Sequence, residues 1–262
     1  MKKMKHIITC IFLLVGSHMA FSQEYKVAVQ NSRDEKVVLN DFPSEILVEG
    51  YSGKEIILTS MDNRSGETPD RAKGLKPIYA GGVDNTGIGL SVEKKGNVVT
   101  VQCLLPITRS AEYKIKVPDN IALRIKKGCE RGGKVTVQNM KNEVEINVCH
   151  SIVLNNVSGP LVLSTISGDI DIAFTEVSKD KPISIATVSG RIDVTLPAKT
   201  PMDLDMGTVS GNIYSDFDFE AGDKQMRRIG GSTINTQLNG GGVDIKLTTV
   251  SGNIYLRKGK VS

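Results

Sequence analysis

The chain has 262 residues, a formal net charge of +4 at pH 7, no tryptophan and only 5% aromatic residues. Three lysines and no acidic residue lie in the first 22 positions, so the remainder of the chain carries a net charge of only +1. This near-neutral balance argues against a nucleic-acid partner, and the scarcity of aromatic rings argues against an aromatic sugar-stacking platform.

Residues 1–22 have the organisation of a secretory signal peptide. A basic start precedes an apolar stretch at residues 7–15, and Ala20 and Ser22 place small residues before a cut ahead of Gln23. The apolar stretch is about half of the roughly 20 residues that a membrane-spanning helix needs. We therefore expect an exported protein without a membrane span, located in the periplasm, on the outer surface of a Gram-negative cell or outside the cell.

Residues 23–120 are predicted to form irregular β coils that cap the more regular part at 121–262, with which they are expected to be continuous as one domain. Alternating or β-branched segments predict strands at 25–29, 45–49, 55–60, 89–93, 98–104 and 113–117. Residues 61–86 are rich in Gly, Pro, Asn and Asp, and this composition predicts a long surface loop.

A short phrase recurs four times in the second half of the chain. It reads T-I-S-G-D-I at 165–170, T-V-S-G-R-I at 187–192, and T-V-S-G-N-I at 208–213 and 249–254. The first three phrases are about 20 residues apart, and the last gap is about two periods long, with glycine-rich turns at 230–232 and 239–242 and an expected loop at 219–228. A fixed period of this length is typical of solenoids.

Each Ser-Gly turn is followed by alternation of polar and apolar residues, which predicts a half-buried strand. Further strands are expected at 134–137, 143–148, 152–154, 161–163, 182–185, 202–204 and 243–247, or about two per period. The predicted fold is an all-β, parallel β-helix-like solenoid of stacked coils of about 20 residues, paired at about 4.8 Å. An end strand is expected near Ile254. Positive charge at Arg257, Lys258 and Lys260 would discourage edge pairing there and favours a monomer.

The runs T-V-S-G-R-I-D-V, T-V-S-G-N-I-Y and K-I-K-V-P-D-N-I-A-L-R-I at 114–125 resemble a family of secreted bacterial adhesin-like proteins of unknown function. The family is related to the head-domain adhesin-like proteins of Gram-negative envelopes. The resemblance covers nearly all of the mature chain and is strongest from Lys114 onward. It implies a parallel β-helix-like solenoid and an envelope location, and it supplies no catalytic residues.

The sequence gives little support for an enzyme. His150 is the only histidine after residue 22, and a lone histidine beside a turn is more often structural than a general base. The repeated serines do not lie in a G-x-S-x-G elbow, and one serine per coil is better explained by the corner that it builds. We expect no catalytic residue and no cofactor.

Aspartates recur at outward positions of the predicted strands, and Asp169, Asp171 and Asp193 are weak candidates for metal ligands. Stacked carboxylates on neighbouring coils could hold a hard cation such as calcium. However, alternating acids are also usual on exposed sheets, and the glycine-rich calcium repeat is absent. The other acids of this pattern are Asp203, Asp205, Asp216, Asp218 and Asp244, with Arg191 and Lys246 nearby.

Three cysteines follow residue 22, so at least one is unpaired or pairs between molecules. Cys129 and Cys149 are 20 residues apart, close to one coil, and stacking could bring them within disulfide range. Their phase relative to neighbouring apolar residues places them at corners or outward positions. A metal site formed by Cys103 with these two is disfavoured because no C-x-x-C pair exists.

Three functions fit this sequence. The first is a non-catalytic, secreted envelope protein that presents a rigid polar face, or its loops, to a cell-surface glycan or an envelope protein. The second is a calcium-dependent protein that binds or cleaves polysaccharide. The third is a periplasmic structural or sensing protein with a protein partner.

Overall fold

The computed structural model describes residues 24–43, 45–61, 70–75, 78–109, 111–179, 181–219 and 231–259. In these residues, twenty strands form two ten-stranded sheets, and the sole helical element is a 3₁₀ turn at Asp70–Ala72. The predicted all-β class is confirmed. The predicted signal peptide, most of the predicted loop at 219–228 and parts of the one at 61–86 lie outside the described residues. No helix in the described ranges has the length and hydrophobicity to cross a membrane.

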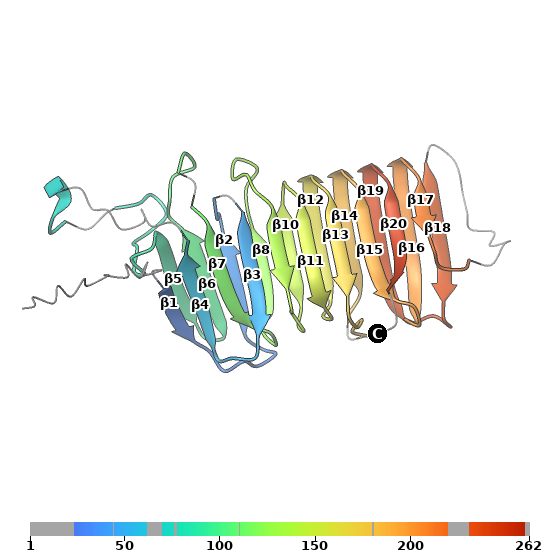
Figure 1. Cartoon of the computed structure of the whole chain (residues 1–262), viewed down its shortest axis with the longest axis horizontal. Coiled ribbons are helices and arrows are strands. Elements are labelled where there is room, and N and C mark those ends of the chain that lie inside the picture. Colours follow the sequence, from blue (N-terminus) through green and yellow to red (C-terminus); the bar gives the residue numbers. More distant parts are fainter. Residues whose placement is uncertain are drawn as a thin grey trace, which may run out of the picture.

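Both sheets run along one long axis (Figure 1). Sheet A contains, in spatial order, β1 (Glu24–Ala28), β4 (Glu55–Ser60), β7 (Tyr113–Pro118), β3 (Ile46–Tyr51), β9 (Val135–Gln138), β11 (Ile152–Val157), β13 (Ile170–Phe174), β15 (Ile192–Pro197), β20 (Ile254–Gly259) and β17 (Ile213–Ser215). Sheet B contains, from the opposite end, β18 (Ser232–Leu238), β16 (Met202–Ser210), β19 (Val243–Ser251), β14 (Ile183–Ser189), β12 (Leu161–Ser167), β10 (Val144–Val148), β8 (Ala122–Lys126), β2 (Lys36–Asn40), β6 (Val98–Cys103) and β5 (Leu90–Lys95).

The central part, from β8 to β15, is solenoid-like. The chain alternates between the sheets, and each strand pairs in parallel with the strand two elements later, as β10 does with β12 and β11 with β13. Equivalent apolar residues fall in register, for example Ile152 with Ile170 and Ile170 with Ile192. Strands of residues 24–120 pair directly with this part, since β2 lies beside β8 and β3 beside β9.

The ends differ from the parallel solenoid that the sequence predicted, because the two sheets are mixed. At one end β1 pairs antiparallel with β4, β4 pairs antiparallel with β7, and β5 pairs antiparallel with β6. At the other end β18 pairs antiparallel with β16. A parallel β-helix through the whole chain was therefore the wrong expectation for these outer strands.

The order of the strands also departs from the order of the chain at both ends. The last two strands are inserted one coil inward, with β19 between β14 and β16 and β20 between β15 and β17. The first coil is inserted in the same way, with β2 between β8 and β6 and β3 between β9 and β7. The prediction of an end strand near Ile254 is wrong, since β20 has neighbours on both sides. The repeated phrases are nearly identical, so their sequence does not determine which of them lie side by side.

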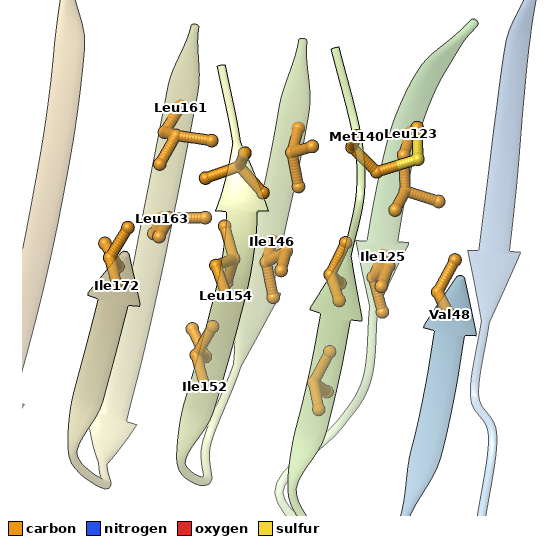
Figure 2. Packing of buried hydrophobic residues seen from close by; sticks show 14 of the residues in the cluster. Val48, Leu123, Ile125, Met140, Ile146, Ile152, Leu154, Leu161, Leu163 and Ile172 are labelled. Carbon is orange, nitrogen blue, oxygen red and sulfur yellow. The ribbon is translucent and has the colours of Figure 1, made fainter. Parts of the chain in front are cut away.

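Inward-facing apolar residues fill the space between the sheets. Figure 2 shows Leu154 and Ile172 from sheet A beside Ile146 and Leu163 from sheet B, and all four are almost completely buried. Branched side chains fit this surface because they pack well on a pleated sheet. Burying each such side chain contributes about 1.5–3 kcal/mol, so the column of stacked coils provides most of the stabilisation.

The repeated phrase forms a corner at which neighbouring coils are joined by the same contacts. Its threonine is buried, and the hydroxyl donates to a backbone carbonyl of the adjacent coil. The contacts are Thr165 to His150 (2.9 Å), Thr187 to Gly168 (3.3 Å), Thr249 to Gly190 (3.1 Å) and Thr208 to Gly252 (2.9 Å). Gly190 has a φ of 153°, and a Cβ there would lie 2.1 Å from the carbonyl oxygen of Gly168. The glycine thus allows the coils to approach closely.

Candidate functional site

The outer face of sheet A from β13 to β17, which we call the A face, gathers charged, amide and aromatic side chains. Its central row is in register across four strands, with Asp171 beside Asp193, Asp193 beside Tyr255, and Tyr255 beside Tyr214. Parallel strands lie about 4.8 Å apart, so this row repeats functional groups at that spacing. The other members of the A face are Asp169, Arg191, Asn212, Asn253 and Arg257.

The three acids predicted as weak metal candidates each contact an arginine. Arg191 bonds to Asp169 and also to Asp171, the latter at 2.8 Å between Nη2 and Oδ2. Arg257 makes a bidentate pair with Asp193, at 2.7 Å from Nε and 2.8 Å from Nη2. The hydrogen bond with Asp193 raises the pKa of Arg257. No group of three or more His, Cys, Asp or Glu side chains in the described ranges is placed to hold a metal ion.

Two tyrosines continue the same row, a feature that the sequence analysis missed. The rings of Tyr214 and Tyr255 stack with centroids 5.2 Å apart and planes inclined by 12°, and the Arg257 guanidinium carbon lies 5.5 Å from the Tyr255 centroid. Tyr214 is 49% exposed and lies on the last strand of sheet A. The signal was present, because both tyrosines occupy the final position of a T-V-S-G-N-I-Y phrase.

The outer face of sheet B carries a different feature, an apolar stripe made by the second residue of each repeated phrase. The four residues are adjacent in the sheet and 47–61% exposed, and they are Ile166, Val188, Val250 and Val209. We call them the B stripe. In a β-strand successive side chains alternate between faces, so the buried threonine before each of them fixes these side chains outward.

The remaining predicted acids gather at the end of the molecule near β18. A cavity of about 1210 Å³ is lined there by Asp203, Asp205, Asp218 and Asp244, with Lys246 and Lys258. Lys246 bonds to Asp205 at 2.7 Å and Lys258 to Asp218 at 2.9 Å. Asp203 accepts a hydrogen bond from the backbone of Gly242, while its Oδ1 atom is buried without a partner. Asp216 lies outside this lining and accepts the backbone N–H of Lys258.

The other residues singled out from the sequence lie away from the A face. Cys129 and Cys149 form a disulfide with their Cα atoms 5.0 Å apart, and Cys103 is a buried free thiol whose pKa is raised by burial. The half-buried His150 lies at a corner of the stack, and its carbonyl accepts the Thr165 hydroxyl. Its Nδ1 atom is buried without a partner.

Fold and faces together define an all-β, solenoid-like protein with long outer surfaces. Residues 131–257 match the model of the family described as Toastrack DUF4097. The resemblance to a family of unknown function, inferred from the repeats, is confirmed by this match.

Similar solved structures share little sequence with this chain. A "putative cell adhesion protein" from Clostridium sporogenes is 12% identical with a TM-score of 0.46, and the match covers 91% of this chain and 100% of that one. A "putative adhesin" from Bacteroides fragilis is 13% identical with a TM-score of 0.34, covering 90% and 95%. Another from Parabacteroides distasonis is 13% identical with a TM-score of 0.30, covering 89% and 95%. No curated protein matches the chain.

Proposed function

We propose that this is an exported, non-catalytic envelope protein that binds an extended surface glycan along the A face. The observation that carries the proposal is the in-register row of two carboxylates and two tyrosines from β13 to β17, beside which Arg191 and Arg257 lie. Such a row offers the same kinds of groups repeatedly along one line, which suits a polymer with repeated hydroxyl groups. The stacked-coil architecture supports it, because solenoids create long, rigid surfaces.

The chemistry of the A face suits sugars in two respects. Bidentate arginine–carboxylate pairs fix the orientation of both partners and leave further donors and lone pairs for hydroxyl groups. The Tyr214 ring, stacked on Tyr255, offers an exposed apolar edge against which the C–H groups of a sugar ring can lie. The arginine contacts of Asp171 and Asp193 also favour binding that is independent of calcium over the calcium-dependent alternative.

Binding of the purified protein to a panel of immobilised bacterial and host glycans tests this proposal. We expect Tyr214→Ala to weaken binding of any retained glycan at least tenfold, and Arg257→Ala to weaken it similarly. Arg124→Ala is the matched control, because Arg124 forms an equivalent pair with Glu145 on sheet B. Equal glycan binding by all variants would show that the A face is not the binding site. Binding that requires added calcium and is abolished by a chelator would reject calcium-independent binding at the A face.

The location needs a separate experiment. Protease treatment of intact cells, followed by detection of the protein and of a periplasmic control, should remove the protein and spare the control. Protection until the outer membrane is broken would instead favour an internal envelope role.

A second candidate function is binding of an envelope protein through the B stripe. The observation that favours it is the exposure of four adjacent β-branched side chains, since contiguous exposed apolar residues are typical of protein contact sites. Cross-linking in cells from Ser164, which borders the stripe on β12, should capture a specific partner. Capture of this partner should be lost in a Val188→Lys variant. An equal yield of cross-linked partner from a probe at Ser184, which lies further from the B stripe, would argue against binding through the stripe.

A further inference from the structure

The two sheets have the same number of strands but end at different places along the axis. Toward the amino-terminal end, sheet A continues for four strands beyond β9, whereas sheet B continues for three strands beyond β8. Toward the opposite end, sheet B continues for three strands beyond β14, whereas sheet A continues for two strands beyond β15. The sheets are therefore offset by one strand, and each end of the described structure has a step, with β1 overhanging at one end and β18 at the other (Figure 1).

Among the described residues, the step at β18 leaves inward side chains without an opposing strand. Thr236 and Leu238 face the same side as Leu204, with which Thr236 is in register, and all three line the cavity of about 1210 Å³ together with Phe217. In the described part of sheet A, the last strand is β17, which pairs only with β20. The space beyond β17 and opposite β18 has the position of one further strand of sheet A.

The step at β1 offers a strand of the required kind. Tyr25 and Val27 are in register with the buried Leu58 and Ile56, so they point toward the interior, where they are only partly covered. Two successive antiparallel pairings, with β4 and then between β4 and β7, make β1 run in the same direction as the parallel strands of sheet A. Translated along the axis, β1 would therefore lie parallel to β17.

The edge strands at the two steps differ in charge. The edge strands β17 and β18 carry no charged residue. Of the charged residues that line the cavity, Asp203, Asp205, Asp244 and Lys246 lie on the outer side of sheet B. At the other step, the edge strands β1 and β5 carry Glu24 and Glu93 with Lys26, Lys94 and Lys95, an excess of one positive charge. Charge on β1 and β5 disfavours pairing between two such ends, whereas the uncharged edges of β17 and β18 present no like charge to them.

We propose that these steps interlock between copies of this chain, so that β1 of one copy occupies the place beyond β17 of the next and covers β18. Tyr25 and Val27 then enter the cavity, and both edges gain main-chain hydrogen bonds. The joint buries on the order of 1,000 Å² in total, near the lower limit for a specific interface, so assembly depends on protein concentration. Repeated joints place the A faces of successive copies in one line.

Cysteine cross-linking tests the geometry directly. The protein carrying Lys26→Cys is mixed with the protein carrying Tyr214→Cys, since these residues lie on the outer side of β1 and β17. We expect a disulfide-linked heterodimer in the mixture and little product from either variant alone. Products from one variant alone would indicate joining of like ends, and capture of a different protein by Tyr214→Cys would indicate a foreign strand at this step. Either result overturns the proposal.

Sedimentation velocity over a range from about 1 to 500 μM measures the association without any cross-link. We expect the wild type to form larger species with increasing concentration and Ile234→Lys, on the inward side of β18, to shift this transition at least tenfold upward. Thr233→Lys, on the outward side of the same strand, is the matched control and should not shift it. A wild type that remains monomeric throughout, or equal behaviour of both variants, contradicts the joint.

Discussion

The central stack and the two ends of this molecule are held together by different means. In the stack, the same threonine–carbonyl contact and the same apolar rows recur from coil to coil. At the amino-terminal end the contacts occur once each. Asp84 accepts the backbone N–H groups of Thr86, Gly87 and Gly89, and Glu35 accepts that of Gln30. Repetition therefore specifies register in the middle, while single polar clusters specify the irregular ends.

The largest difference between these regions should appear when a buried leucine is shortened. Leu154 is fully buried in the stack and Leu238 is 8% exposed at the open step. We expect Leu154→Ala to lower the free energy of unfolding by about 4 kcal/mol, because the packed surroundings leave a cavity. Leu238→Ala should lower it by about 1 kcal/mol. Chemical denaturation measures both values, and equal losses would show that the end is packed as tightly as the stack.

The disulfide lies at the junction between the two regions, and its removal should have the next largest effect. It closes a loop of 20 residues between Cys129 and Cys149. The double variant with alanine at both positions should lose about 3 kcal/mol through greater freedom of the unfolded chain. A reductant should lower the wild type to the same stability and leave the variant unchanged. If the reductant has no effect on the wild type, the two thiols are not bonded.

Breaking the corner should have a somewhat smaller effect that is specific to the stack. Gly190→Ala places a methyl group against the Gly168 carbonyl and imposes an unfavourable backbone conformation, so we expect a loss of about 2 kcal/mol. Gly132→Ala is the matched control, because nothing lies within 4 Å of its Cβ position. Thermal unfolding of both variants measures the difference, and unchanged stability of Gly190→Ala would disprove close packing at the corner.

The smallest effect concerns Lys127, a buried residue at the junction whose ammonium donates to the carbonyl of Gly133 at 3.1 Å. Burial lowers its pKa to about 8, against about 10.4 in an unfolded chain. Between these pH values the unfolded chain binds more protons, so the unfolding free energy should rise by about 1–2 kcal/mol from pH 8 to pH 10. Lys127→Met should remove this rise. An identical pH dependence of the unfolding free energy in the wild type and the variant would contradict a lowered pKa of Lys127.

Sequence patterns predicted most strands but only part of their arrangement. The strands at Tyr25, Glu55 and Tyr113 lie where alternation and β-branched residues placed them. β2 was missed because its run Val37-Val38-Leu39 is continuously apolar and lacks the alternation that marks many of the other strands. β18 was missed because Ile234 and Leu238 are its sole large apolar residues, as is usual for a strand with one open side.

The sequence predicted the outward position of the acidic residues of the candidate site, but it did not predict the contribution of the aromatic residues. Alternation correctly placed Asp169, Asp171 and Asp193 outward, since strand geometry alone decides that. The pairing of Tyr214 with Tyr255 depends on β20 lying beside β17, and nothing local to either strand encodes that neighbour. The long gap before the last phrase was interpreted as an extra coil in line, whereas the final coil is inserted inward.

This insertion constrains how the chain can fold. β16 is synthesised before β19, yet in the finished molecule β19 separates it from β14. Until the last coil is made, β14 can pair with β16 through the same corner contacts, since both carry the repeated phrase. That arrangement leaves the final coil outside the stack and must open before β19 and β20 can enter. The chain is therefore expected to pass through a long-lived misordered intermediate, and its slowest folding step should be the exchange of neighbours at this end.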